Sequence, residues 1–178
     1  MRKIKFYFQQ LYRLALSADK QEKLVWADLK RLHSESKWRS GIYENDKCIE
    51  TIFELGEEKL GKFFYMIYDG FYHCRVKIID VFPIEFTTDL FILASHFNNL
   101  LNNGVVIINV ESQYVEFHMK RDLLVTLLYN GEIYDQLIRH QNISKDIHWA
   151  FEKLINENEA PAIIIADLLN KNKERNNE

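Results

Sequence analysis

Apolar residues spaced three or four positions apart predict two helices at the start of the chain. The first such pattern covers residues 4–15, and this spacing places the apolar side chains on one side of an α-helix. Ser17 and the two residues after it can start a second helix, which has an apolar side and a charged side and should end near residues 34–36. We therefore expect a helical N-terminal segment over residues 1–36 that packs on the main domain.

After Trp38 the pattern changes from a helical period to alternation. The segment "CIETIFEL", which starts at Cys48, alternates along its length and predicts a strand with one wetter face. In "KFFYMIYDGFYHCRVKI" two aromatic runs flank Asp69-Gly70, a dipeptide that suits a two-residue hairpin turn with positive φ. Further along, "GVVIINV" and "YVEFHM" are separated by "ESQ" and predict a second strand pair.

A helix is predicted between the hairpin and the second strand pair. Thr87 or Thr88 can cap its start, and Gly104, just past its end, fits a C-terminal stop. Its apolar stripe consists of Leu90, Leu93, Ala94, Phe97, Leu100 and Leu101. The side expected to face away from this stripe carries Ser95, Asn98, Asn99 and Asn102.

The last third of the chain is harder to interpret. Residues 122–141 could prolong the sheet or start a helix, and Asn142 or Ser144 can cap a further helix. Pro161 suits the first position of a closing helical segment. Because "AIIIADLL" in that segment is apolar nearly all round, we expect it to be deeply buried or to contact a second molecule.

These elements define an α+β fold. The predicted order is α-α-β-β-β-α-β-β-α, and runs of strands joined by tight turns imply an antiparallel sheet, here of about five strands. A length of 178 residues suits one domain with an appended helical segment. We expect the main domain over residues 37–170 and a frayed polar tail over residues 171–178.

Composition narrows the class of protein. Apolar residues make up 47% of the chain, enough for one sizeable core, and the net charge of −3 gives no basic excess for nucleic acid. No stretch reaches the ~18 consecutive apolar residues of a membrane span. Gln9, Gln10 and Arg13 interrupt what could be the apolar part of a signal peptide, so we expect a cytoplasmic protein.

The sequence offers little chemistry. Its six histidines form no pair at i, i+4, its glycines form no phosphate loop, and no metal or cofactor site is predicted. Cys48 and Cys74 are expected to be buried or half-buried free thiols, and a disulfide between them is possible only if their strands are neighbours. His73 and Cys74 should diverge, because adjacent strand residues point to opposite faces. The aromatic hairpin could stack bases, but without a basic strip beside it packing is the better interpretation.

Three stretches resemble the YbjN-like family, which is related in fold to the type III secretion chaperones. These are "FPIEFTTDLFILASHFNNLLN", "NNGVVIINVESQYVEFHM" and "SKDIHWAFEKLINENEAPAIIIADLL". With the preceding hairpin, the resemblance covers roughly residues 38–169 as an order of elements. It implies a sheet with helices packed mainly on one face, frequent homodimers, binding of other proteins, and no catalytic residues.

We therefore expect a non-enzymatic protein-interaction module, chaperone-like or regulatory, that acts as a homodimer. The residues expected to contact a partner protein are Ile164, Ile165, Leu168, Tyr65 and Tyr72. The alternative is that these side chains simply fill the core of the monomer. Two other functions stay open: an immunity or antitoxin-like inhibitor, which would carry a compact acidic patch, and an enzyme with a site built from distant residues, which would have a deep pocket.

Overall fold

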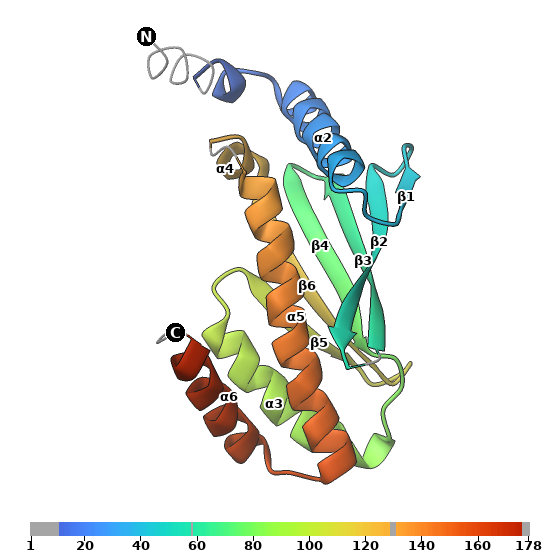
Figure 1. Ribbon diagram of the computed structural model, residues 1–178, viewed down its shortest axis with the longest axis vertical. Coiled ribbons are helices and arrows are strands. Elements are labelled where there is room, and N and C mark those ends of the chain that lie inside the picture. The colour runs from blue at the N-terminus through green and yellow to red at the C-terminus, as the bar shows by residue number, and fades with distance from the viewer. Residues whose placement is uncertain (1–10, 58, 129–130, 176–178) are drawn as a thin grey trace. The chain divides into compact units, whose positions relative to one another are not determined.

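The computed structural model describes residues 11–57, 59–128 and 131–175, and residues 11–14 are helical. The predicted first helix therefore lies largely outside the described residues. The described elements are α2 (Ala18–Glu35), β1 (Ser40–Tyr43), β2 (Cys48–Gly56), β3 (Lys59–Tyr68), β4 (Phe71–Ile79), the 3-10 helix η1 (Ile84–Phe86), α3 (Thr87–Leu100), β5 (Gly104–Asn109), β6 (Tyr114–Asp122), α4 (Leu123–Leu128), α5 (Glu132–Glu157) and α6 (Pro161–Arg175) (Figure 1). Among these, no helix is both long enough and apolar enough to cross a membrane.

The strands form one antiparallel sheet, which confirms the predicted α+β class. Within the described residues the sheet has six strands in the order β1-β2-β3-β4-β6-β5, one more than predicted. The additional strand, β1, was missed because it is only four residues long and mostly exposed, so it carries no apolar alternation. It pairs with β2, so that β1 and β5 are the two edge strands.

The chain forms two compact units. The first comprises Met1–Ile52, Lys62–Cys74 and Lys120–His140, and the second comprises Phe53–Gly61, Arg75–Met119 and Gln141–Glu178. The domain boundaries expected from sequence, at residues 36 and 170, stay a prediction. The closing helix α6 continues to Arg175, past the expected start of the tail.

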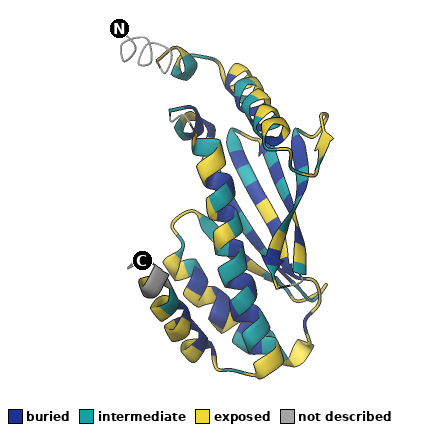
Figure 2. Ribbon diagram, in the orientation of Figure 1, coloured by how far each residue is buried: buried dark blue, intermediate teal, exposed yellow. Residues whose placement is uncertain are grey.

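The predicted second helix, which lies in the first unit, and the predicted hairpin are both confirmed. Helix α2 begins directly after Ser17 and buries Leu29 and its apolar neighbours. Alternate residues of β3 are buried from Phe63 onward, which gives the banded colouring of this strand in Figure 2. Asp69 and Gly70 have φ angles of 52° and 76°, as the predicted turn requires.

Residues 122–141, for which the sequence allowed either a strand or a helix, are mainly helical where they are described. Helix α5 does not begin at Asn142 or Ser144, because a single buried stripe continues through this region at helical spacing. The buried positions of this stripe are Leu137, His140, Ser144, Ile147, Phe151 and Leu154. Pro161 is the first residue of α6, as predicted.

In the second unit α3 lies beside α6 (Figure 1). The predicted stripe of α3 is confirmed for Leu90, Leu93, Ala94 and Phe97, all of which are buried. The stripe is shorter than predicted, since the helix ends at Leu100, whose side chain is exposed. The Phe97 ring lies 6.2 Å from the ring of Phe151, a residue of α5 that belongs to the same unit.

Gly104 was predicted to stop the preceding helix, but it does not have this role. It is the first residue of β5, and its φ is not positive. A Cβ atom at this position would lie 2.7 Å from Cε2 of Phe117 on β6. Glycine is therefore required here by the close approach of the Phe117 ring.

Gly104→Ala is accordingly expected to destabilise the protein by about 1–3 kcal/mol, since the buried ring must shift to admit the methyl group. Gly41→Ala is the matched control, because Gly41 is also a strand residue and the added Cβ would meet its nearest neighbour at an ordinary 3.5 Å. Urea denaturation of both variants measures the difference. Equal stability of the two variants would show that Phe117 does not constrain position 104.

The two cysteines are buried and are not joined in a disulfide. Cys48 lies on β2 and Cys74 on β4, and β3 separates these strands in the sheet. The predicted condition for a disulfide, neighbouring strands, is therefore not met.

Candidate functional site

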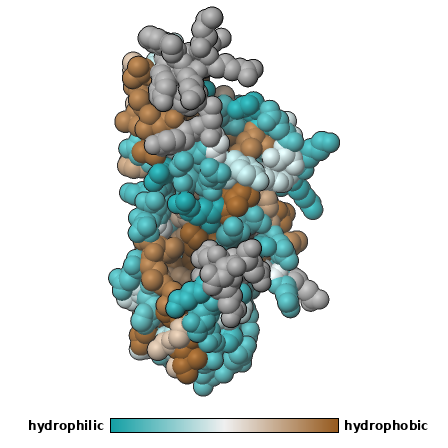
Figure 3. Space-filling model, turned by 60° about the vertical axis from the view of Figure 1, so that its left-hand side comes forward, coloured by the Kyte–Doolittle hydropathy of each residue, from teal (hydrophilic) through white to brown (hydrophobic). Residues whose placement is uncertain are grey.

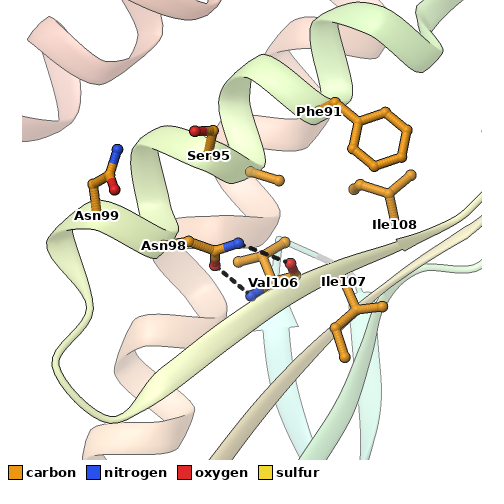
Figure 4. Close-up of a pocket in the computed structure, with 8 residues that line it drawn as sticks. Phe91, Ser95, Asn98, Asn99, Val106, Ile107 and Ile108 are labelled. Carbon is orange, nitrogen blue, oxygen red and sulfur yellow. Dashed lines mark hydrogen bonds between the residues drawn. The ribbon is translucent and has the colours of Figure 1, made fainter.

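A groove of about 390 Å³ lies in the second unit between α3 and the edge strand β5 (Figure 4). Its walls are formed by Phe91, Ala94, Ser95, Asn98, Asn99, Val106, Ile107 and Ile108. The groove arises because α3 leads directly into β5 and folds back along it, so a helix covers part of the outer edge of the sheet.

The helical wall presents one side of α3. Phe91, Ser95 and Asn98 are separated by four and three residues, the spacing that aligns side chains along a helix. Phe91 is 49% exposed, an unusual amount of water contact for a phenylalanine ring. Figure 4 shows its ring close to Ile108, with Asn98 and Asn99 further along the helix. The groove therefore has an apolar end and an amide-rich end.

The strand wall is the outer edge of β5. One side of this strand pairs with β6, where Val106 lies opposite Phe117 and Ile108 opposite Val115. On the other side, the Val106 N–H donates to Asn98 Oδ1 at 2.7 Å, and Asn98 Nδ2 donates to the Val106 carbonyl at 3.1 Å. The backbone groups of Val106 therefore point away from β6. Because strand residues alternate, those of Ile108 point to the same open edge.

The groove is electrically neutral, since its eight described lining residues carry no ionisable side chain. A second depression, in the first unit, differs in this respect. It has about 380 Å³ and is lined by residues that include Arg13, Asp28, Arg31 and Glu132. Its charges largely compensate one another, as in the ion pair of 3.1 Å between Arg31 and Asp28. Of the two, the neutral groove is the one lined by residues of an edge strand.

The sequence-based interpretation of Asn98 was wrong. This residue was expected to face away from the apolar side of the helix, but it is half-buried and binds the backbone of β5. Ser95 and Asn99 are exposed as expected, yet they also line the groove. Local spacing places these residues opposite the buried stripe. It does not reveal that a strand eight residues later returns beside them.

The residues predicted to contact a partner are all buried in the chain. Tyr65 and Tyr72 lie in the first unit with their rings stacked 6.3 Å apart. Ile164, Ile165 and Leu168 are buried on α6 in the second unit, whereas Ile163 and Leu169 of the same helix are exposed. In this structure the five side chains contribute to the cores of their units. A contact with another protein through them stays a prediction.

Cys74 and Tyr65, which carry groups that could act chemically, lie in the core of the first unit. Burial raises the pKa of the Cys74 thiol to about 12, so it stays protonated and is a poor nucleophile. Burial also raises the pKa of Tyr65 well above its ordinary value. The His73 ring stacks on the Tyr68 ring with the centroids 3.8 Å apart, whereas the neighbouring Cys74 is buried. The side chains of His73 and Cys74 thus point to opposite faces of the sheet, as expected for adjacent strand residues. In the described part of the chain, no three His, Cys, Asp or Glu residues converge on a metal site.

Exposed apolar side chains are found on several elements of the described part of the chain. On the face drawn in Figure 3, hydrophobic side chains form patches that hydrophilic residues separate. Exposed apolar residues in the second unit include Phe91 and Ile92 on α3 and Val105 and Ile107 on β5. The exposed apolar side chains at α3 and β5 thus accompany an open strand edge.

Comparison with known proteins gives a likeness of structure alone. No family model matches the chain, and no curated protein matches it in sequence. The crystal structure of YbjN from E. coli, a proposed transcription regulator, is similar with a TM-score of 0.51 and 9% sequence identity. The likeness covers 68% of this chain and 86% of YbjN. The resemblance noted in the sequence is therefore confirmed at the level of the fold, and the chain has a YbjN-like fold.

Proposed function

We propose that this chain is a non-enzymatic protein-interaction module that binds an extended segment of a partner protein in the groove between α3 and β5. The observation that carries this proposal is an edge strand whose outward backbone groups lie beside an exposed phenylalanine. Proteins commonly recognise extended peptides by adding them as a strand to such an edge. Backbone hydrogen bonds then supply affinity, and alternate side chains supply specificity.

The lining of the groove defines the partner segment. An added strand would pair with the outward N–H and C=O of Ile108 and would place an apolar side chain against Phe91. Because the lining residues carry no charge, a charged segment would lose hydration without gaining an ion pair. The expected occupant is therefore an uncharged segment with apolar residues at alternate positions.

Neither alternative function has an observation in its favour that is as specific. An acidic inhibitor would display an acidic patch, and acidic side chains do gather where α5 meets α6. However, Glu157, Glu159 and Asp167 share the ammonium group of Lys153, which partly neutralises them. An enzyme would need an activated group, whereas the pKa of Cys74 is raised by burial.

The homodimer and the cytoplasmic location inferred from sequence remain part of the proposal. Light scattering coupled to size exclusion measures the mass in solution. A mass twice that of the 21.3 kDa chain is the expected result.

Binding is tested with a short labelled peptide of alternating threonine and valine, which is uncharged and adopts extended structure readily. Fluorescence anisotropy is expected to show saturable binding that Phe91→Ser weakens by about tenfold, since the variant removes the apolar end of the groove. Ile92→Ser is the matched control, because Ile92 is similarly exposed on the same helix, at 44%, but does not line the groove.

A second peptide separates strand addition from general hydrophobic adsorption. It has the same side chains, but alternate backbone nitrogens are methylated and cannot donate hydrogen bonds. We expect it not to bind. Equal binding of both peptides, or equal effects of Phe91→Ser and Ile92→Ser, would contradict the proposed function.

A further inference from the structure

The contact between Asn98 and Val106 has the form of strand pairing. In an antiparallel sheet, a hydrogen-bonded residue exchanges an N–H···O and an O···H–N bond with a single residue on the neighbouring strand. The side-chain amide of Asn98 makes this pair of bonds with Val106, at 2.7 and 3.1 Å. A carboxamide has the same donor and acceptor as a peptide group. Asn98 therefore occupies the place that one hydrogen-bonded residue of an added strand would take (Figure 4).

Position and exposure allow this contact to open without unfolding α3. Asn98 is half-buried, and its neighbours Ser95 and Asn99 on the groove side are exposed. The helix is held by other residues, namely the buried stripe that contains Leu90 and Phe97. A rotation of the Asn98 side chain alone would free the Val106 N–H and C=O. Edge strands are commonly protected from indiscriminate pairing by such local devices.

We propose that Asn98 is an intramolecular competitor that closes the edge of β5 and that an incoming uncharged strand displaces it. This inference rests on the proposed function and adds its regulation. The bonds that a partner forms with Val106 replace those of Asn98, so the net gain on binding comes from the neighbouring positions. The competition from Asn98 therefore lowers the affinity of the groove for every strand. It restricts binding to segments that also fit beside Phe91 and Ile108.

The test compares Asn98→Ala with wild type in binding the threonine–valine peptide. Removal of the competitor is expected to tighten binding by about tenfold, the effect of one typical hydrogen-bonded contact. Asn99→Ala is the matched control, because it removes the same side chain from the next position of the groove wall without touching Val106. It is expected to bind like wild type.

A measurement on the wild-type protein covers the case in which Asn98→Ala does not fold. The side-chain amide protons of Asn98 are followed by NMR during the peptide titration. We expect them to become accessible to solvent exchange as the peptide binds. If the peptide binds while these protons stay protected, or if Asn98→Ala binds no more tightly than wild type, the inference is overturned and the proposed function stands. If the peptide binds neither protein, both are overturned.

Discussion

Replacing Ile164 by aspartate is expected to lower the free energy of unfolding by about 4 kcal/mol or more. Ile164 is 0% exposed on the side of α6 that is buried in the second unit. The substitution removes a buried apolar side chain and places a carboxylate where it would lose its hydration. Effects of this size arise from few causes, and a buried unpaired charge is among them.

Ile163→Asp provides the matched control, because Ile163 is the preceding residue of the same helix and is 52% exposed. It is expected to change stability by less than about 0.5 kcal/mol. Denaturation in urea compares the two variants, and light scattering reports their mass. If Ile164→Asp remained as stable as wild type and merely halved the mass of an oligomer, Ile164 would be an interface residue, and the core assignment would be wrong.

Stability is expected to fall by about 2 kcal/mol between about pH 7 and about pH 5 because of His33. Burial lowers the pKa of His33 from 6.5 to about 4, so the folded protein keeps this ring neutral. The unfolded chain takes up a proton already near pH 6.5. The stabilisation is therefore complete above pH 6.5 and decreases as the pH falls towards 4, where the total loss reaches up to about 3 kcal/mol.

The surroundings of His33 account for the low pKa. Its Nδ1 lies 3.0 Å from Ser40 Oγ, and the Trp38 ring meets it edge-on with the centroids 5.1 Å apart. Neither the Ser40 hydroxyl nor the Trp38 indole carries a negative charge that could stabilise a protonated imidazole. His33→Leu is expected to flatten the dependence on pH, with a smaller slope remaining because burial also lowers the pKa of His148.

Urea denaturation of wild type and His33→Leu near both pH values provides the measurement. His96→Gln is the control for the loss of a histidine as such, since His96 is exposed on α3. An equal loss of stability in wild type and His33→Leu would assign the effect to other groups.

The parts of the fold that sequence predicts well are those fixed by neighbouring residues. The Asp69-Gly70 turn needs two positive φ angles, and that dipeptide provides them locally. Pro161 begins α6 because a first helical position needs no N–H bond. By contrast, Asn142 and Ser144 look like caps but lie inside α5, where the buried stripe continues through Ser144.

The candidate site was not predicted, because it depends on how distant elements meet. Phe91 and Asn98 lie on predicted helix positions, but only the return of β5 beside α3 turns them into the wall of a groove. The sequence "AIIIADLL" predicted burial or a partner equally well, since both require apolar side chains. A run of apolar residues indicates that the segment is shielded from water, but it does not identify what covers it. The structure shows that α3 lies beside α6, the helix that contains this run.

The most direct test of strand addition is amide hydrogen exchange at Ile108 in the wild-type protein, with and without the threonine–valine peptide. The Ile108 N–H points to the open edge, whereas those of Val105 and Ile107 point towards β6 and serve as internal references. Bound peptide is expected to slow exchange at Ile108 and leave the two references unchanged. Saturated binding with unchanged exchange at Ile108 would contradict the account, because the peptide would then bind somewhere other than the edge of β5.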